Sequence, residues 1–82
     1  MSGALVTTIG EALWGPHWQA EMAHALGISR STTQDWRQGR SGPRDGHLRD
    51  LLEIARQRQA GVAEAISTIE HEIERRRDDR GA

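Results

Sequence analysis

The sequence predicts a small all-α fold of four to five helices. Apolar residues recur at intervals of three and four along most of the 82 residues, which is the spacing of one face of a helix. Glycine and proline are grouped between these stretches, where they end helices. The length is that of one compact domain with a modest core.

The first predicted helix ends at Gly15 and Pro16, which lead into the next one. Its apolar face is formed by Leu5, Ile9, Ala12 and Leu13. Gly10 lies inside this helix and costs about 1 kcal/mol relative to alanine, so we expect the helix to be short or bent. Trp14 and Trp18 are expected to pack between the first two helices as core residues.

Residues 18–39 predict two short helices joined by a tight turn. Met22 and Leu26 share one face of the first helix, and Gly27 supplies the positive φ that ends it. The turn leads directly into a second helix, so the two helices are expected to pack against each other.

The second helix begins near Arg30. The preceding Ser29 is its N-cap, because the serine hydroxyl can accept a hydrogen bond from a backbone N–H two or three residues later. Trp36 is the residue that faces inward, and Gly39 ends the helix. Each helix of the pair is therefore about two turns long.

Three residues of this helix pair have the properties that a close crossing of two helices requires. Ala23 is small where the helices cross, Gly27 supplies the turn, and Trp36 fixes the second helix to the core. Together they resemble the helix-turn-helix of the Cro and phage-repressor type, the Cro/C1-like family, in which Gln19 would open the first helix. Thr33 stands where the family usually has Val or Ile, and its hydroxyl needs a partner. The alternative is a generic helical hairpin in a small bundle.

The resemblance implies that the second helix enters the major groove of double-stranded DNA. The residues placed to reach base edges are Arg30, Ser31 and Asp35, with Thr32 and Gln34 at the margins. The residues placed to contact phosphates are Gln19, Ser29, Arg37, Arg40 and Arg44. Arg30 is expected to pair bidentately with guanine, for about 1–3 kcal/mol of discrimination. Asp35 either accepts from cytosine or holds Arg30 or Arg37 in place.

The distribution of charge favours the same segment. Residues 28–49 carry five arginines and two acids, whereas residues 50–82 carry eight acids and six arginines. The net charge of the whole chain is −1. Positive charge therefore gathers around the second helix of the pair and the loop after it, where phosphates would lie.

After a loop at residues 40–46, a long helix carries a heptad seam. The seam consists of Leu48, Leu52, Ala55, Val62, Ile66, Ile69 and Ile73. It is interrupted only by Gln59 and is broadened by Leu51, Ile54 and Ala65. A broader stripe is what the helix needs if its first half, up to about Arg58, also covers the core.

The last part of the seam extends past what a three-helix core can cover. Its residues are Val62, Ile66, Ile69 and Ile73. We expect them to pair with a second copy of the chain, which makes a homodimer. The alternative is that the last helix folds back on its own domain. With a break or kink expected at Gly61, the chain divides into a DNA-binding unit at residues 1–60 and a dimerisation helix at residues 61–82.

The composition argues against several other classes of protein. The four histidines are scattered and there is no cysteine, so no metal site is expected. Ser31 and Thr32 have no histidine nearby to act as a base, so we expect neither an enzyme nor a bound cofactor or small-molecule ligand. No apolar run is long enough to span a membrane and the first residues lack the features of a signal peptide, so the expected location is cytoplasmic.

The sequence therefore predicts a homodimeric, sequence-specific DNA-binding transcription regulator that reads an inverted-repeat operator. Repression, including autorepression, is the expected outcome because no segment for sensing an effector is evident. Small regulators of phages and mobile elements resemble this plan. The alternatives are a helical protein-interaction module that uses the heptad face, and a DNA-binding accessory factor of a mobile element.

Overall fold

The structure, a computed structural model, describes residues 3–81, with the side chains of residues 3–79. Within that range it contains four helices and no strand. The helices are α1 (Ala4–Trp14), α2 (Trp18–Leu26), α3 (Arg30–Gln38) and α4 (Asp45–Gly81). The expected all-α fold is confirmed, with four helices rather than five.

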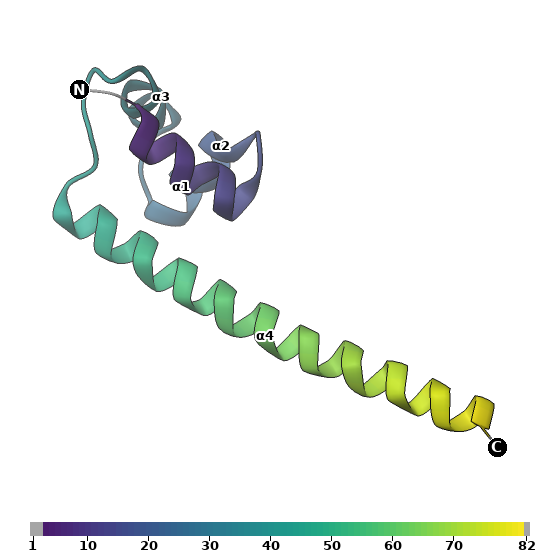
Figure 1. The fold of residues 1–82 in the computed structure, drawn as a ribbon. Helices are drawn as coiled ribbons and strands as arrows, with labels where there is room; N and C mark the ends of the chain where they lie inside the picture. The colour runs from purple at the N-terminus through teal and green to yellow at the C-terminus, as the bar shows by residue number, and fades with distance from the viewer. Residues whose placement is uncertain (1–2, 82) are drawn as a thin grey trace.

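Helices α1 to α3 and the first turns of α4 form a compact unit, residues 3–58, which we call the head (Figure 1). The rest of α4 extends away from the head as a single helix, and the molecule measures 62 × 22 × 19 Å. At the edge of the head, Arg58 Nη1 donates to the Leu13 carbonyl oxygen at 2.8 Å. The chain is therefore compact only in the head, and α4 does not fold back on it.

The core of the head receives side chains from all four helices. Its buried members are Val6, Trp18, Met22, Trp36 and Leu51. The inward positions expected for Trp18 and Trp36 are confirmed. Full burial of a large apolar side chain contributes about 1.5–3 kcal/mol to stability. From α4 it is Leu51 that fills the core, whereas its seam neighbour Leu52 is 50% exposed.

The face that α1 presents to the core matches the expected one only in part, because Ile9 and Leu13 pack against the core and the other two expected residues do not. Val6 and Gly10 are buried, whereas Leu5 and Ala12 are exposed. The cause is the indole of Trp18, which lies against the backbone at residue 10: a Cβ added to Gly10 would be 2.3 Å from Trp18 Cδ2. The glycine permits this close approach. Helix α1 runs through Gly10 for 11 residues and ends before Gly15, so Gly10 does not shorten it.

Helix α4 runs without interruption from Asp45 to Gly81, so the break or kink expected at Gly61 is wrong. The space around Gly61 is open, and the residues on either side of it include strong helix formers such as Ala60. The cost of about 1 kcal/mol for one glycine is too small to end a helix in that setting. The expected boundary between the two parts of the chain therefore lies inside one continuous element.

Helix α4 carries an uncovered apolar strip, most of it beyond the head. Its members, which we call the α4 strip, are Leu52, Val62, Ile66, Ile69 and Ile73. Each of these side chains is 50–56% exposed. Within residues 3–81 no helix combines the length and the apolar character that a membrane crossing requires. Apart from Leu48, which packs against the core, and the half-buried Ala55, the apolar seam predicted from the sequence is thus an open face in the single chain.

Candidate nucleic-acid interface

Glycines in the left-handed conformation end both helices of the α2–turn–α3 unit, residues 18–39. Gly27 has a φ of 67° at the end of α2. The N–H of Ile28 donates to the Ala23 carbonyl oxygen at 3.0 Å, which is a Schellman hydrogen bond. Gly39 ends α3 with a φ of 78°. The two short helices and the glycine turn predicted from the sequence are confirmed.

The start of α3 is capped by Ser29, as predicted. The Ser29 hydroxyl accepts from the backbone N–H of Thr32 at 3.2 Å. It also lies 2.9 Å from the hydroxyl oxygens of Ser31 and Thr32. Three of the predicted contact residues therefore form one hydroxyl cluster at the N-terminus of α3. This end of a helix carries partial positive charge and unpaired N–H groups, which favour an anion.

Helix α3 has a buried side and an exposed side. Thr33 and Trp36 are buried. Thr33 Oγ1 donates to the Arg30 carbonyl oxygen at 2.8 Å, which supplies the partner that a buried hydroxyl needs. On the opposite side, Arg30, Ser31 and Gln34 are exposed. The buried side of α3 anchors the helix in the core, and its other side therefore presents three of the residues predicted to reach base edges at the surface.

Asp35 holds neither Arg30 nor Arg37, so that expectation is wrong. Instead, Arg40 Nε and Nη2 both donate to Asp35 Oδ1, at 2.9 and 2.7 Å. The pairing arises because Gly39 turns the chain, so that the N–H of Arg40 donates to the Asp35 carbonyl oxygen at 2.9 Å. One predicted phosphate contact is therefore already engaged with an acid at the end of α3.

Two of the predicted phosphate contacts come together from different helices. Gln19 at the start of α2 and Arg37 near the end of α3 line one surface hollow of about 430 Å³. Glu11 of α1 lines the same hollow. Sequence spacing does not reveal this acid, because the spacing within one helix carries no information about which helix lies opposite. Its carboxylate reduces the positive potential on this part of the surface.

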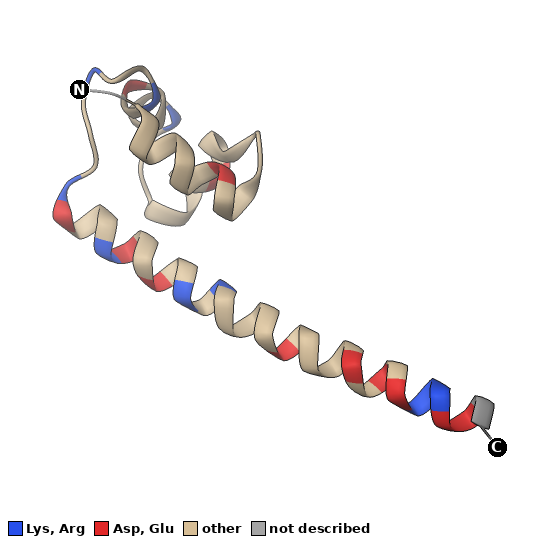
Figure 2. Ribbon diagram, in the orientation of Figure 1, with Lys and Arg blue, Asp and Glu red and all other residues tan. Residues whose placement is uncertain are grey.

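The arginines of the head lie around α3. Figure 2 shows basic residues on α3, in the loop after it and at the start of α4, whereas α1 and α2 carry none. Among the described side chains, Arg30, Arg37 and Arg44 are exposed and form no ion pair. At the other end of the molecule, Glu72 pairs with Arg76 at 3.0 Å. Arg49 and Arg56 of α4 are exposed and without an ion pair as well, so three of these five guanidinium groups of the head belong to α3 or to the loop after it.

A contact that the sequence did not predict fixes the loop before α4. His47 lies with its ring centroid 5.1 Å from that of Trp36, at an interplanar angle of 59°. Its Nδ1 accepts from the backbone N–H of Arg44 at 3.2 Å. The bond has the geometry of one half of a capping box, but Arg44 and His47 are not the Ser/Thr and Glu/Gln of that motif, so the sequence held no signal for the contact. The contact attaches the backbone of Arg44 to the head.

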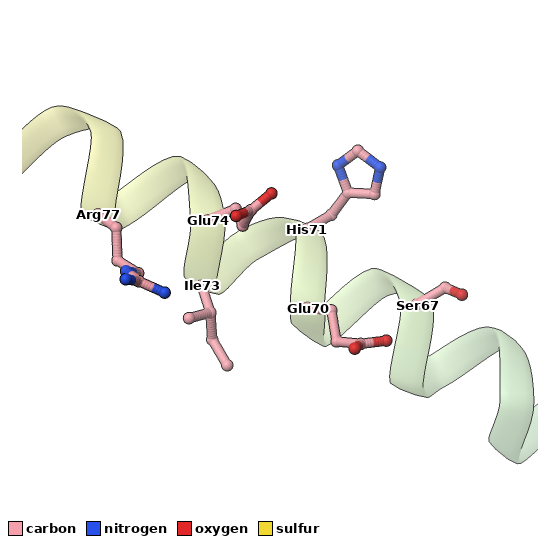
Figure 3. Close-up of a pocket in the computed structure, with 6 residues that line it drawn as sticks. All are labelled: Ser67, Glu70, His71, Ile73, Glu74 and Arg77. Carbon is pink, nitrogen blue, oxygen red and sulfur yellow. The ribbon is translucent and has the colours of Figure 1, made fainter.

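A hollow of about 460 Å³ lies on the outer part of α4 (Figure 3). It is lined by Ser67, Glu70, His71, Ile73, Glu74 and Arg77. Figure 3 shows that all six project from one helix, with His71 pointing away from Ile73 and Arg77. A ligand site needs walls from several elements to remove the ligand from water, so we assign none here. No cluster of three His, Cys, Asp or Glu placed to hold a metal ion occurs in the described part of the chain.

The candidate interface consists of three features: the capped start of α3, its exposed polar side and the free arginines around it. All three belong to the head, and the outer part of α4 contributes to none of them. Comparisons with known protein families, with characterised proteins and with solved structures found no match to this chain.

Proposed function

We propose that this protein is a sequence-specific DNA-binding transcription regulator that places the N-terminal half of α3 in the major groove. The observation that carries this proposal is the exposed side of α3, where Arg30, Ser31 and Gln34 project from a capped helix start while the opposite side is anchored in the core. The major groove is wide enough to admit one helix, and polar side chains at its N-terminal end reach base edges.

Each group of residues has its own role in this proposal. Arg30 pairs bidentately with a guanine, because its guanidinium is exposed and forms no ion pair among the described side chains. Arg37 and Arg44 are likewise exposed and form no ion pair among the described side chains. They contact phosphates on either side of the groove. The hydroxyl cluster at Ser29 and the N–H groups beside it bind a further phosphate.

A single head makes few contacts, and two heads are needed for tight binding. We assign the pairing to the α4 strip, whose side chains are half exposed in the single chain. A two-fold pair of heads reads an inverted repeat with half-sites about 34 Å apart. Bound there, the dimer blocks access to the DNA and acts as a repressor, in the cytoplasm and without a cofactor or a chemical step of its own.

Selection of binding sites from a pool of random duplexes tests this function. The full-length chain is expected to enrich one inverted repeat, with two chains bound per duplex. The affinity for that duplex should fall steeply as the salt concentration rises, because arginine–phosphate contacts release counterions. A pool that returns no enriched sequence after repeated rounds, with protein of confirmed helical content, overturns the proposal.

A further inference from the structure

We propose that the α4 strips of two copies form a parallel, in-register, two-stranded coiled coil. This inference rests on the proposed function, because it specifies how the two heads are joined.

The exposed apolar residues of α4 fall on one heptad register. Positions a are occupied by Leu52, Ile66 and Ile73, and positions d by Val62 and Ile69. Of the large apolar side chains that are exposed in the described residues, only Leu5 lies elsewhere. A helix that projects beyond its own domain with such a face is marginal in water, because most helix stability comes from packing that face. A partner helix with the same register covers every member of the strip.

Gln59 limits the coiled coil to two strands. It is exposed and occupies an a position between Leu52 and Ile66. Isoleucine at both a and d favours three or four strands, whereas a polar Asn or Lys at a single a position specifies the register and the number of strands, and we assign that role here to the amide of Gln59. In a parallel pair the two Gln59 amides face each other, and each can donate to the other's oxygen and accept from its nitrogen.

The flanking charges fit a parallel pair. In that arrangement a g residue lies beside the e residue five positions later on the second copy. Across the exposed part of α4, Glu72 at g and Arg77 at e form the one such pair in which both residues are charged, and their charges are opposite. Within the described side chains Arg77 has no ion-pair partner, so its guanidinium can join Arg75 and Arg76, which already pair with Glu72 in each chain, at the Glu72 carboxylate of the second copy.

An antiparallel pair that matches the same apolar layers fits less well. It sets Val62 against Ile73 and brings Arg56 beside Arg77 of the second copy, which are like charges. It also sets Arg58 against Asp79, but Arg58 already donates to the Leu13 carbonyl oxygen. At 1.5 Å per residue, it separates the two heads by about 50 Å along the coil, whereas adjacent half-sites need about 34 Å. A parallel pair places both heads at one end.

Disulfide crosslinking distinguishes these arrangements, because the chain has no cysteine of its own. In the parallel coil, residue 62 of one chain lies opposite residue 62 of the second chain, so the single variant Val62→Cys should form a disulfide-linked dimer on mild oxidation. Ile69→Cys should do the same. His71→Cys, at an f position on the opposite side of the helix, is the matched control and should crosslink far more slowly. Circular dichroism confirms that each variant is helical, and sedimentation equilibrium of the wild type should give twice 9.1 kDa.

Two outcomes overturn the coiled coil, and a third overturns the role of Gln59 in it. One is a wild type that sediments as a 9.1 kDa monomer, or that pairs only with another protein. Another is crosslinking between Val62→Cys and Ile73→Cys chains in a mixture without self-crosslinking of either, which identifies the antiparallel pair. The third concerns Gln59→Ile, which should shift the assembly to three or four chains; if it stays dimeric, Gln59 does not set the number of strands.

These measurements need no DNA, so their failure is distinct from failure of the proposed function. A monomeric wild type that still enriches a DNA site retains the DNA-binding role of α3 and loses the coiled coil. A parallel dimer that enriches no site retains the coiled coil and loses the regulator.

Discussion

Arg40 binds the carboxylate of Asp35 at the end of α3, with Nε and Nη2 at 2.9 and 2.7 Å from the same oxygen. Arg40 also donates to the Gln38 side chain. Both members of the ion pair are well exposed, at 60% and 44%, so it contributes little to stability. Its main effect is on the surface charge, because it cancels one positive group beside the three free arginines of the interface.

Replacing Asp35 with asparagine should therefore strengthen binding to DNA of any sequence. Asp35→Asn removes a negative charge near the phosphates and frees the guanidinium of Arg40. The dependence of the logarithm of affinity on the logarithm of salt concentration should become steeper by about one contact. Fluorescence anisotropy at several salt concentrations measures both effects. Asp78→Asn, the same change at the far end of α4, is the control and should leave affinity unchanged.

The opposite result would assign Asp35 a different role. If Asp35→Asn weakens binding to the selected site and leaves scrambled DNA unaffected, Asp35 contacts a base, as a carboxylate does when it accepts from cytosine.

The cap of α3 should contribute measurably to stability and also to DNA binding. Ser29→Ala removes the acceptor of the Thr32 N–H and should lower the free energy of unfolding by about 0.5–2 kcal/mol. Ser29→Asp restores a cap but places a negative charge where a phosphate is proposed to bind. Urea denaturation should therefore show recovered stability, while anisotropy shows weakened DNA binding. Recovery of both in Ser29→Asp would mean that no phosphate lies at this end of α3.

Two glycines in helices should respond in opposite ways to alanine. At Gly10 the added methyl would lie 2.3 Å from the Trp18 ring, and the resulting overpacking should lower the free energy of unfolding by about 1–3 kcal/mol. At Gly61 no atom lies within 4 Å of the added methyl, so Gly61→Ala should raise it by about 0.5–1 kcal/mol. Thermal and urea denaturation at one fixed protein concentration compare the two. Equal effects would show that Trp18 does not lie against α1.

The outer end of α4 should lose helix in acid. The pKa of Glu72 lies below its ordinary value because hydrogen bonds from Arg75, and then from Arg76, favour the charged carboxylate. The stabilisation of the helix by these hydrogen bonds to the Glu72 carboxylate is therefore complete above the ordinary glutamate pKa of about 4.3. It is lost as the pH falls through the lowered pKa of Glu72. Circular dichroism at 222 nm should show this loss in the wild type and a smaller one in Glu72→Gln. Glu74→Gln, on the same helix but outside these pairs, should behave as the wild type does.

The α2–turn–α3 unit could be predicted from the sequence because its signals are local. The cap at Ser29 and the left-handed glycines at residues 27 and 39 each act within a few residues of the chain. The apolar seam of α4 could also be predicted, although the continuity of the helix through Gly61 was not, because the seam depends only on spacing within one helix.

Other features depend on segments that are distant in the sequence, and spacing alone did not reveal them. The buried face of α1 is set by the Trp18 ring against Gly10, which no periodicity within α1 records. The partner of Asp35 is set by the path of the chain after Gly39. The break expected at Gly61 was wrong for another reason: one residue of low helix propensity does not end a helix when the residues around it favour the helix.

The role of Arg30 as a reader of base edges is tested most directly by comparing two arginine variants on two duplexes. The affinities of the wild type, Arg30→Ala and Arg37→Ala are measured for the selected inverted repeat and for a scrambled duplex of equal composition. Arg30→Ala should lose about 1–3 kcal/mol of discrimination per half-site and keep its affinity for the scrambled duplex, whereas Arg37→Ala should weaken both equally. Retention of the full wild-type discrimination by Arg30→Ala would contradict the account.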